Sequence, residues 1–289
     1  MDKREGHLPA AIGGLKVRYR FGLISDTHMP ERWHRIPETL PEIFAGVTMI
    51  LHAGDVGELW VLDQLGAIAP VIAVHGNDEP SSTPHHLPAK QIVTAAEQRI
   101  LVWHGHYPDR VDELESRRWP DIRPKLERIA QHGRQVEARM VHFGHWHVPL
   151  LCEIEGVLLV NAGAIASGNF VTRQLVQTVA IASLLEDGRF HITHIDLADG
   201  QLHHPPDVTG TDFVTAAQPY IGSILAPELE AELPRLRDNP ILLPALRRLA
   251  PRCWWGGQAS VSRTDLIMEI EQITPATSEQ TELLAILRS

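Results

Sequence analysis

The sequence predicts an α/β fold whose core is mixed or divided into two sheets, followed by a smaller helical appendix. Three observations support this prediction: short apolar runs alternate with helical patterns in the first half, adjacent strand patterns follow in the middle, and helical patterns fill the end. Alternating strands and helices are typical of βαβ units in a parallel sheet, whereas adjacent strands joined by tight turns indicate antiparallel pairs. Both kinds of pairing are therefore expected.

The first half of the chain carries five short strand patterns with helical patterns between them. Each strand pattern is a short apolar run that ends in polar residues, and the last helical pattern places Ile122, Leu126 and Ile129 on one face. The strands are expected at residues 17–25, 48–53, 70–75, 100–104 and 140–143, and the helices at residues 38–45, 58–67 and 121–139.

Two hairpins and then a helical tail are expected in the second half. The pairs Glu155-Gly156 and Asp187-Gly188 are typical hairpin turns, and residues 199–206 have the composition of a linker. We therefore divide the chain into a domain at residues 1–200 and a helical extension at residues 207–289. The hairpin strands are expected at residues 150–154 with 157–160 and 175–184 with 190–195, and the tail helices at residues 227–237, 240–249, 263–273 and 278–287.

Composition narrows the class of protein. The net charge of −10 argues against a surface that wraps nucleic acid or lies on an anionic membrane, so neither partner is expected. The two cysteines form neither a disulfide framework nor a zinc pattern, and we find no signal peptide and no run of about 18 apolar residues. These features favour the cytoplasm, and they leave open whether the chain forms a homo-oligomer.

Side chains of metal-ligand type follow each of the five strands predicted in the first half. They are Asp26 and His28 after the first strand, Asp55 after the second, Asn77 after the third, His104 after the fourth, and His145 and His147 after the fifth. The carboxyl ends of strands in an α/β sheet meet at one edge, and residues two apart in an extended segment point to the same side. The seven side chains are therefore expected to face one centre.

The types of these ligands predict two ions. Imidazole favours borderline transition metals and carboxylate or amide oxygen favours harder ions, so the mixed set suits Mn²⁺, Fe or Zn²⁺. Seven ligands are too many for one catalytic ion, and two cations about 3.5–4 Å apart can clamp the attacking and phosphoryl oxygens of a phosphate ester. Glycines beside the ligands allow tight turns and close approach of an anion, namely Gly54, Gly76, Gly105 and Gly144.

Each of these residues also has a purely structural explanation when it is taken alone. Asp26 could cap a helix, Asp55 and Asn77 follow glycine as turn residues often do, and His104 could be a hydrogen-bonded core histidine. The recurrence of a ligand-type residue after every strand favours the metal centre over these separate explanations.

The ordered motifs DTH, GD, GN, HGH and GHWH resemble those of the calcineurin-like metallophosphoesterases, especially their small prokaryotic phosphodiesterase branch, over residues 18–197. The resemblance implies a four-layer αββα sandwich of two mixed sheets with a dinuclear centre, for which we expect Mn, with Fe, Zn or Ni as alternatives. The ligands it implies are Asp26, His28 and His147 for the first ion, Asn77, His104 and His145 for the second, and Asp55 as the bridge.

One residue departs from the family pattern. Many members have a histidine after the GN asparagine, where it stabilises charge or protonates the leaving group, whereas this chain has Asp78. Two nearby cations would keep an aspartate ionised, so phosphodiesters with good leaving groups, which need less help from a proton donor, are expected over monoesters. The expected catalytic residues are Asp55, Asn77, Asp78 and His104, with Arg32 and Asn77 binding the substrate phosphate; Arg32 could instead face water.

The sequence thus predicts a metal-dependent phosphoric ester hydrolase in which a metal-bound hydroxide attacks a small phosphodiester or nucleotide-type substrate. The alternative is a non-catalytic interaction scaffold on the same fold, as in the retromer subunit that resembles this family, because a fold alone does not fix a function.

Overall fold

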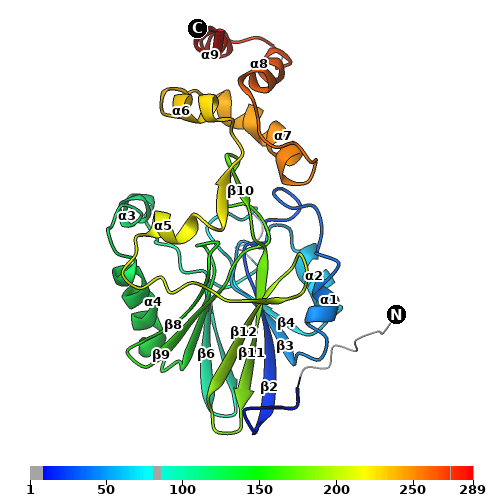
Figure 1. The fold of residues 1–289 in the computed structure, drawn as a ribbon, viewed down its shortest axis with the longest axis vertical. Coiled ribbons are helices and arrows are strands. Elements are labelled where there is room, and N and C mark those ends of the chain that lie inside the picture. The colour runs from blue at the N-terminus through cyan, green and yellow to red at the C-terminus, as the bar shows by residue number, and fades with distance from the viewer. Residues whose placement is uncertain (1–8, 81–85, 274, 289) are drawn as a thin grey trace. The chain divides into compact units, whose positions relative to one another are not determined.

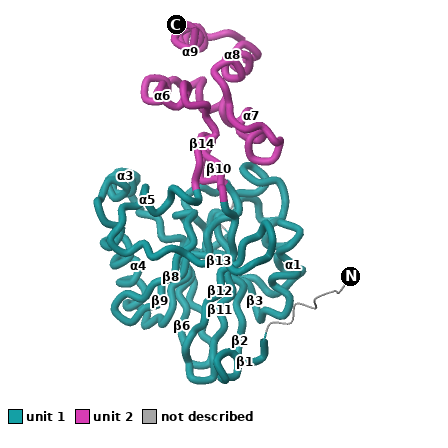
Figure 2. Tube along the Cα trace, viewed as in Figure 1, with its two compact units in different colours: residues 1–166, 176–220 teal, residues 167–175, 221–289 magenta. Residues whose placement is uncertain are grey.

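The structure is a computed structural model that describes residues 9–80, 86–273 and 275–288. The chain divides into two compact units (Figure 2). We call the described parts of residues 1–166 and 176–220 the sandwich unit, and the described parts of residues 167–175 and 221–289 the helical unit.

The first sheet of the sandwich unit joins strands from both halves of the chain. Among the described residues it has seven strands in the order β13-β12-β11-β2-β3-β4, with β1 paired to β2. The pairs β2–β3 and β3–β4 are parallel and the other pairs are antiparallel, as the mixed pattern predicts. The strands are β1 (Ala11–Ile12), β2 (Leu15–Ile24), β3 (Met49–His52), β4 (Val71–Ala73), β11 (Thr178–Leu185), β12 (Phe190–Asp196) and β13 (Leu202–His203).

The second sheet contains the last two ligand-bearing strands. It has five strands within the described ranges, in the order β5-β6-β7-β9-β8, with β6–β7 and β7–β9 parallel. Its antiparallel edge strand β5 was not predicted from the sequence, because its Lys, Gln and Thr residues weaken the apolar pattern. The strands are β5 (Lys90–Ala95), β6 (Gln98–Trp103), β7 (Met140–Phe143), β8 (Pro149–Ile154) and β9 (Val157–Ala162).

The two sheets pack face to face with helices on their outer faces (Figure 1). Phe21 and Leu23 of β2 belong to the buried cluster between the sheets, whereas Ile24 belongs to the cluster beneath α1 and α2. Ile122, Leu126 and Ile129, which were predicted to share one helix face, pack together against the second sheet. These layers confirm the αββα sandwich. The helices are α1 (Leu40–Ile43), α2 (Trp60–Gly66), α3 (Arg110–Ser116), α4 (Arg123–Gln135) and α5 (Phe213–Ala217).

The helical unit has its own buried core. Leu246 of α7, Leu266 of α8 and Leu283 of α9 belong to a single apolar cluster, so the predicted helical appendix is present. None of the described helices has the length and apolar character needed to cross a lipid bilayer. The elements of this unit are β10 (Thr172–Gln174), β14 (Ile221–Ser223), α6 (Pro227–Leu236), α7 (Leu242–Trp254), α8 (Arg263–Glu271) and α9 (Ser278–Arg288).

The boundary between the units lies elsewhere than the expected division at residues 200–207. Residues 207–220 stay with the sandwich unit because Val208, Phe213 and Ala216 pack into the apolar cluster over its second sheet. Residues 167–175 join the helical unit because β10 pairs with β14, so the strand expected to begin at residue 175 begins instead at Thr178.

Candidate metal centre

All seven predicted ligands lie in the sandwich unit, just beyond the carboxyl ends of β2, β3, β4, β6 and β7. The first three strands belong to one sheet and the last two to the other. The ligands therefore come from the carboxyl ends of strands in both sheets. Six of these residues have little exposed side-chain surface, and Asn77 is the exposed member.

The first candidate site consists of Asp26, His28 and His147. One ligand atom of each lies within 4.8 Å of the others, and His147 Nε2 is 3.2 Å from Asp26 Oδ1. The other nitrogen of His147, Nδ1, is 2.9 Å from the carbonyl oxygen of Ala166. Because a carbonyl only accepts, Nδ1 carries the proton of the neutral ring, and Nε2 is left with a lone pair directed at the centre.

The second candidate site consists of Asp55, His104 and His145, whose ligand atoms meet the same 4.8 Å limit. His104 Nδ1 is 2.8 Å from the carbonyl oxygen of Ala53, so its Nε2 also faces the centre, 3.1 Å from Asn77 Oδ1. The structure therefore brings Asn77 to the second site together with the two histidines.

Asp55 connects the two sites. Its Oδ2 lies 3.4 Å from His28 Nε2 of the first site and 3.2 Å from His104 Nε2 of the second. Its Oδ1 accepts a hydrogen bond of 2.9 Å from the backbone N–H of Asp78, which fixes the orientation of the carboxylate. One oxygen placed between imidazoles of both sites is the geometry that a bridging ligand requires.

The backbone at the centre is strained. A non-glycine residue with positive φ costs about 1–2 kcal/mol, and such strain persists where the surroundings impose it, often at functional sites. Five of the seven predicted ligands adopt this conformation, with φ of 54° at Asp26, 43° at His28, 53° at Asp55, 70° at His145 and 57° at His147.

Two of the predicted glycines have clear steric roles. A Cβ built on Gly76 would lie 2.0 Å from Asp55 Oδ1, so only glycine lets this loop approach the bridging carboxylate. Gly54 has a φ of +90°, and a Cβ there would lie 2.8 Å from His104 Nδ1.

Burial and charge act in opposite directions on the ionisable groups of the centre. Burial would raise the pKa of the Asp26 and Asp55 carboxyls, but His147 beside Asp26, and His104 and His28 beside Asp55, hold both pKa values below the usual range. Burial lowers the pKa of His28 to about 3, whereas at His104 the Asp55 carboxylate outweighs burial and raises the pKa to about 9. A divalent cation would compete with protons for these nitrogens.

The residues present fit a pair of divalent cations. The set of imidazoles, carboxylates and an amide is the kind of mixed donor set that borderline divalent metals accept. Within the described part of the chain, the buried His28 Nε2 has no hydrogen-bond partner, although Asp55 Oδ2 lies 3.4 Å away. A buried polar atom of this kind needs a partner, and a cation between the nitrogen and the carboxylate would provide it.

Arg32 and Asp78 are paired with each other at the edge of the centre. The Arg32 side chain is 4% exposed rather than facing water, and its Nη2 forms an ion pair with the Asp78 carboxylate, which is half-exposed. Arg32 is held further by its backbone N–H, which donates to the carbonyl oxygen of His28 over 2.9 Å. Asp78 is therefore an acceptor for a buried guanidinium beside the bridging aspartate.

Glu79 ties two ligand loops together, and sequence reasoning missed it. Its carboxylate accepts hydrogen bonds from the backbone N–H groups of Val56 and Gly57, each at 2.9 Å, and of Gly76 at 3.1 Å. Burial, followed by the charge of Asp55, raises the pKa of this carboxyl, while the three N–H groups oppose that rise. Its position two residues after the predicted ligand Asn77 is the sequence feature that could have indicated a role for Glu79 at the centre.

Glu113 of α3 is the second residue that sequence reasoning missed. Its Oε2 lies 3.0 Å from His145 Nε2. The helix has only seven residues, begins after the capping residue Asp109 and has no apolar stripe, so the sequence gave no sign that one of its acids turns inward.

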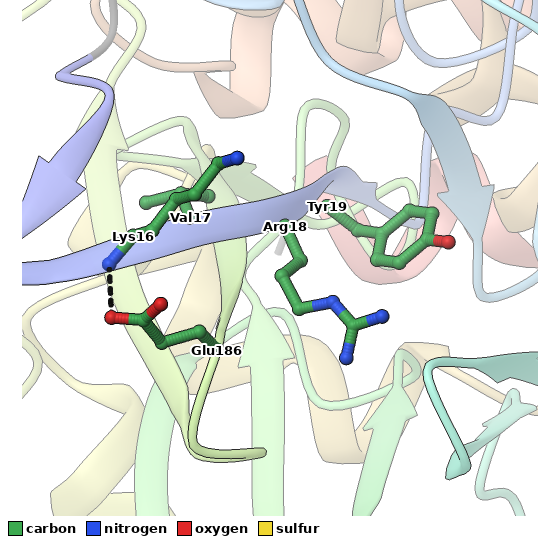
Figure 3. Close-up of a pocket in the computed structure, with 5 residues that line it drawn as sticks. All are labelled: Lys16, Val17, Arg18, Tyr19 and Glu186. Carbon is green, nitrogen blue, oxygen red and sulfur yellow. Dashed lines mark hydrogen bonds between the residues drawn. The ribbon is translucent and has the colours of Figure 1, made fainter.

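A hollow of about 420 Å³ lies away from this centre, beside the amino-terminal half of β2 (Figure 3). Lys16, Val17, Arg18, Tyr19 and Glu186 line it, and the Lys16 backbone N–H donates to Glu186 Oε1 over 3.1 Å. At about 3.3 Å per strand residue, Tyr19 is roughly 20 Å from Asp26. The hollow is therefore no part of the candidate centre.

Sequence and structure comparisons find the following similar proteins. A family model described as the calcineurin-like phosphoesterase superfamily domain matches residues 19–187. A probable metallophosphoesterase of Methanocaldococcus jannaschii is 32% identical over 53% of this chain and 70% of its own length. A second, from Methanothermobacter thermautotrophicus, is 31% identical over 50% of this chain and 75% of its own. Among solved structures, Vps29 of Entamoeba histolytica complexed with zinc aligns with a TM-score of 0.49 and 21% identity, over 64% of this chain and 96% of that one.

Proposed function

Because the chain belongs to the calcineurin-like phosphoesterase superfamily, we propose that it is a dinuclear metal-dependent phosphoesterase that hydrolyses small phosphodiesters. The observation that carries this proposal is the position of Asp55 Oδ2, within 3.4 Å of an imidazole nitrogen of each candidate site. A carboxylate shared in this way distinguishes a two-ion centre from two unrelated sites.

In this proposal Asp26, His28 and His147 hold the first ion, and Asn77, His104 and His145 hold the second, with Asp55 shared. Two bound divalent cations supply an activated water and neutralise charge on the phosphoryl oxygens. Manganese is the proposed metal, with iron, zinc or nickel as alternatives, because the donor set mixes nitrogen and oxygen.

The chain's own residues orient the reactants. The Ala53 and Ala166 carbonyl oxygens fix the rings of His104 and His147, so their nitrogens need little rearrangement during the reaction. Asn77 is the exposed member of the set, so its amide is the group that meets an incoming phosphate. Attack by a water molecule would form a new bond to phosphorus while the bond to the leaving oxygen breaks, and the proton lost by the water would pass to solvent.

The pairing of Asp78 with Arg32 supports the preference for diesters. A carboxylate that accepts from a buried guanidinium has no proton to offer a leaving alkoxide. Substrates whose leaving groups depart without protonation are therefore favoured, and the proton comes from solvent.

The test compares hydrolysis of bis-(p-nitrophenyl) phosphate and p-nitrophenyl phosphate by manganese-loaded protein and by the Asp55→Ala variant. We expect the unaltered protein to hydrolyse the diester faster than the monoester. In the Asp55→Ala variant, the rate should fall to that of the unaltered protein without added metal. Metal analysis should find about two ions per unaltered chain. Equal rates for the two proteins would refute the proposal and favour the interaction scaffold, and faster turnover of the monoester would refute the diester preference alone.

A further inference from the structure

His145 is oriented differently from the other histidines of the centre. His28, His104 and His147 each place Nε2 within 3.4 Å of a carboxylate oxygen of Asp26 or Asp55. In His104 and His147 the opposite nitrogen, Nδ1, is held by a backbone carbonyl oxygen. The rings of His104 and His147 therefore follow one plan, in which Nε2 faces the centre and a backbone carbonyl oxygen anchors Nδ1.

Among the described residues, no backbone carbonyl oxygen accepts from the ring of His145, and its Nε2 lies 3.0 Å from Glu113 Oε2. The angles between these two groups are not those of a hydrogen bond, although the distance is short enough. A small rotation of the His145 ring or of the Glu113 side chain would align them. An imidazole that binds a metal through one nitrogen carries its proton on the other, and that N–H normally donates to a carbonyl or a carboxylate. With Nε2 beside Glu113, Nδ1 is the nitrogen available to the second site.

Glu113 is itself held in place by groups of the surrounding loop and helices. Its Oε2 accepts from the backbone N–H of Tyr107 at 3.3 Å, and its Oε1 lies 3.4 Å from Arg117 Nε and 3.8 Å from Lys125 Nζ. Lys125 is 1% exposed and donates to Ser116 Oγ over 2.8 Å. The Glu113 carboxylate is therefore fixed between a buried cation and His145, rather than free in solvent.

Glu113 is much less exposed than the neighbouring acids of α3. The neighbouring acids Asp112 and Glu115 are exposed, while Glu113 has a side-chain exposure of 13%. An acid placed on a short helix only for solubility would share the exposure of these neighbours.

We propose that Glu113 is a positioning residue for the second metal site: its carboxylate accepts the Nε2–H of His145 and directs Nδ1 of that ring to the ion. This inference rests on the proposed two-ion function. A carboxylate behind a histidine ligand fixes its tautomer and increases its donor strength. Removing the carboxylate therefore weakens the second site and leaves the first unchanged.

The experiment compares Glu113→Ala and Glu113→Gln with the matched control Glu115→Ala, which removes an exposed acid from the same helix. Calorimetric titration with Mn²⁺ measures the affinity of each site, and thermal unfolding checks that each variant folds. We expect Glu113→Ala to weaken binding of one ion by about 10–100-fold. Glu113→Gln should lose less, because its amide oxygen still accepts the N–H and its size is unchanged. Glu115→Ala should match the unaltered protein.

A second measurement distinguishes an anchor of His145 from a general loss of negative charge. In Co²⁺-loaded protein, proton NMR in water shows a shifted signal for each protected N–H of a histidine ligand. Glu113→Ala should lose one such signal, because the Nε2–H of His145 then exchanges rapidly with water.

Four outcomes would overturn the inference. If the unaltered protein binds two ions and both Glu113 variants bind them equally well, the inference fails and the proposed function stands. An equal loss of affinity in Glu115→Ala, or retention of every shifted N–H signal in Glu113→Ala, would also reject Glu113 as an anchor. If the unaltered protein binds no divalent metal, the proposed function fails first and this inference fails with it.

Discussion

The two candidate sites are assembled from different kinds of support. At the first site, Asp26 is fully buried, both of its oxygens lie 3.1 Å from the backbone N–H of His145, and His147 is anchored by the carbonyl of Ala166. At the second site, the carbonyl of Ala53 anchors His104 in the same way, but Asn77 is exposed and the His145 ring contacts the side chain of Glu113. Backbone partners are fixed by the fold, whereas side-chain partners can turn away. We therefore expect the first site to bind its ion more tightly and the second to respond more to mutation around it.

The largest effect should come from a change that removes both sites at once. In Gly76→Ala the new Cβ would lie 2.0 Å from Asp55 Oδ1, so the shared carboxylate or the Asn77 loop has to move. We expect loss of both ions and of diesterase activity, with a cost of about 1–3 kcal/mol in the free energy of unfolding. Gly66→Ala in α2 is the control, because a Cβ there meets nothing within 4 Å. Full metal content in Gly76→Ala would refute the shared role of Asp55.

The next comparison separates the sites. Asp26→Asn removes the charge of the first site in an isosteric way, whereas Asn77→Ala removes the exposed ligand of the second. If the first site is the tighter one, Asp26→Asn should lower affinity for one ion by about a hundredfold or more and Asn77→Ala by about tenfold. Competition with a chelator at increasing concentration measures both values. The reverse order would show that burial does not set the relative strength of the sites.

A smaller effect is expected from the link between two ligand loops. In Glu79→Gln a single amide oxygen replaces a carboxylate that accepts from Val56, Gly57 and Gly76, so at least one backbone N–H loses its partner. We expect a loss of about 1–3 kcal/mol in the free energy of unfolding. A parallel loss of about tenfold in kcat/KM is expected from looser ligand loops.

Denaturant titration and steady-state kinetics check the two effects. Glu58→Gln is the matched control, since this acid is exposed in the same region of the chain. Unchanged kinetics in a destabilised Glu79→Gln protein would mean that Glu79 supports the fold without orienting the ligands.

The parts of the fold that local sequence patterns record were predicted from the sequence. The strands before the ligands were predicted because each is a short apolar run that ends in a residue of metal-ligand type, and β7 (Met140–Phe143) has the predicted bounds. The sandwich and its helical appendix followed from the same patterns together with the family resemblance.

Features that depend on pairing between distant residues were not predictable in this way. The ribbon of β10 and β14 joins segments almost fifty residues apart, and neither segment has more than three residues to form a pattern. Glu113 approaches His145 only because the helix that carries it folds back over the end of the second sheet, a position that no local spacing records. The positive φ values of the ligands likewise follow from convergence at the centre rather than from the residue types.

The smallest expected effect concerns a histidine that is buried between the sheets but belongs to neither site. His194 of β12 places Nε2 2.8 Å from the carbonyl oxygen of Asn161, and burial, opposed by that hydrogen bond, lowers its pKa to about 4. The unfolded chain therefore binds the proton first, so His194 contributes its full stability above the ordinary histidine pKa of about 6.5 and loses it as the pH falls towards 4. The loss is at most about 3 kcal/mol.

Denaturant titrations at pH 7.5, 6 and 5 test this expectation. In His194→Gln the amide can still donate to Asn161 but does not titrate, so the fall in unfolding free energy between pH 7.5 and pH 5 should be shallower than in the unaltered protein. The exposed His191→Gln, on the same strand, should keep the original slope. Equal slopes in all three proteins would show that the acid sensitivity of the sandwich comes from other groups, including the ligand histidines themselves.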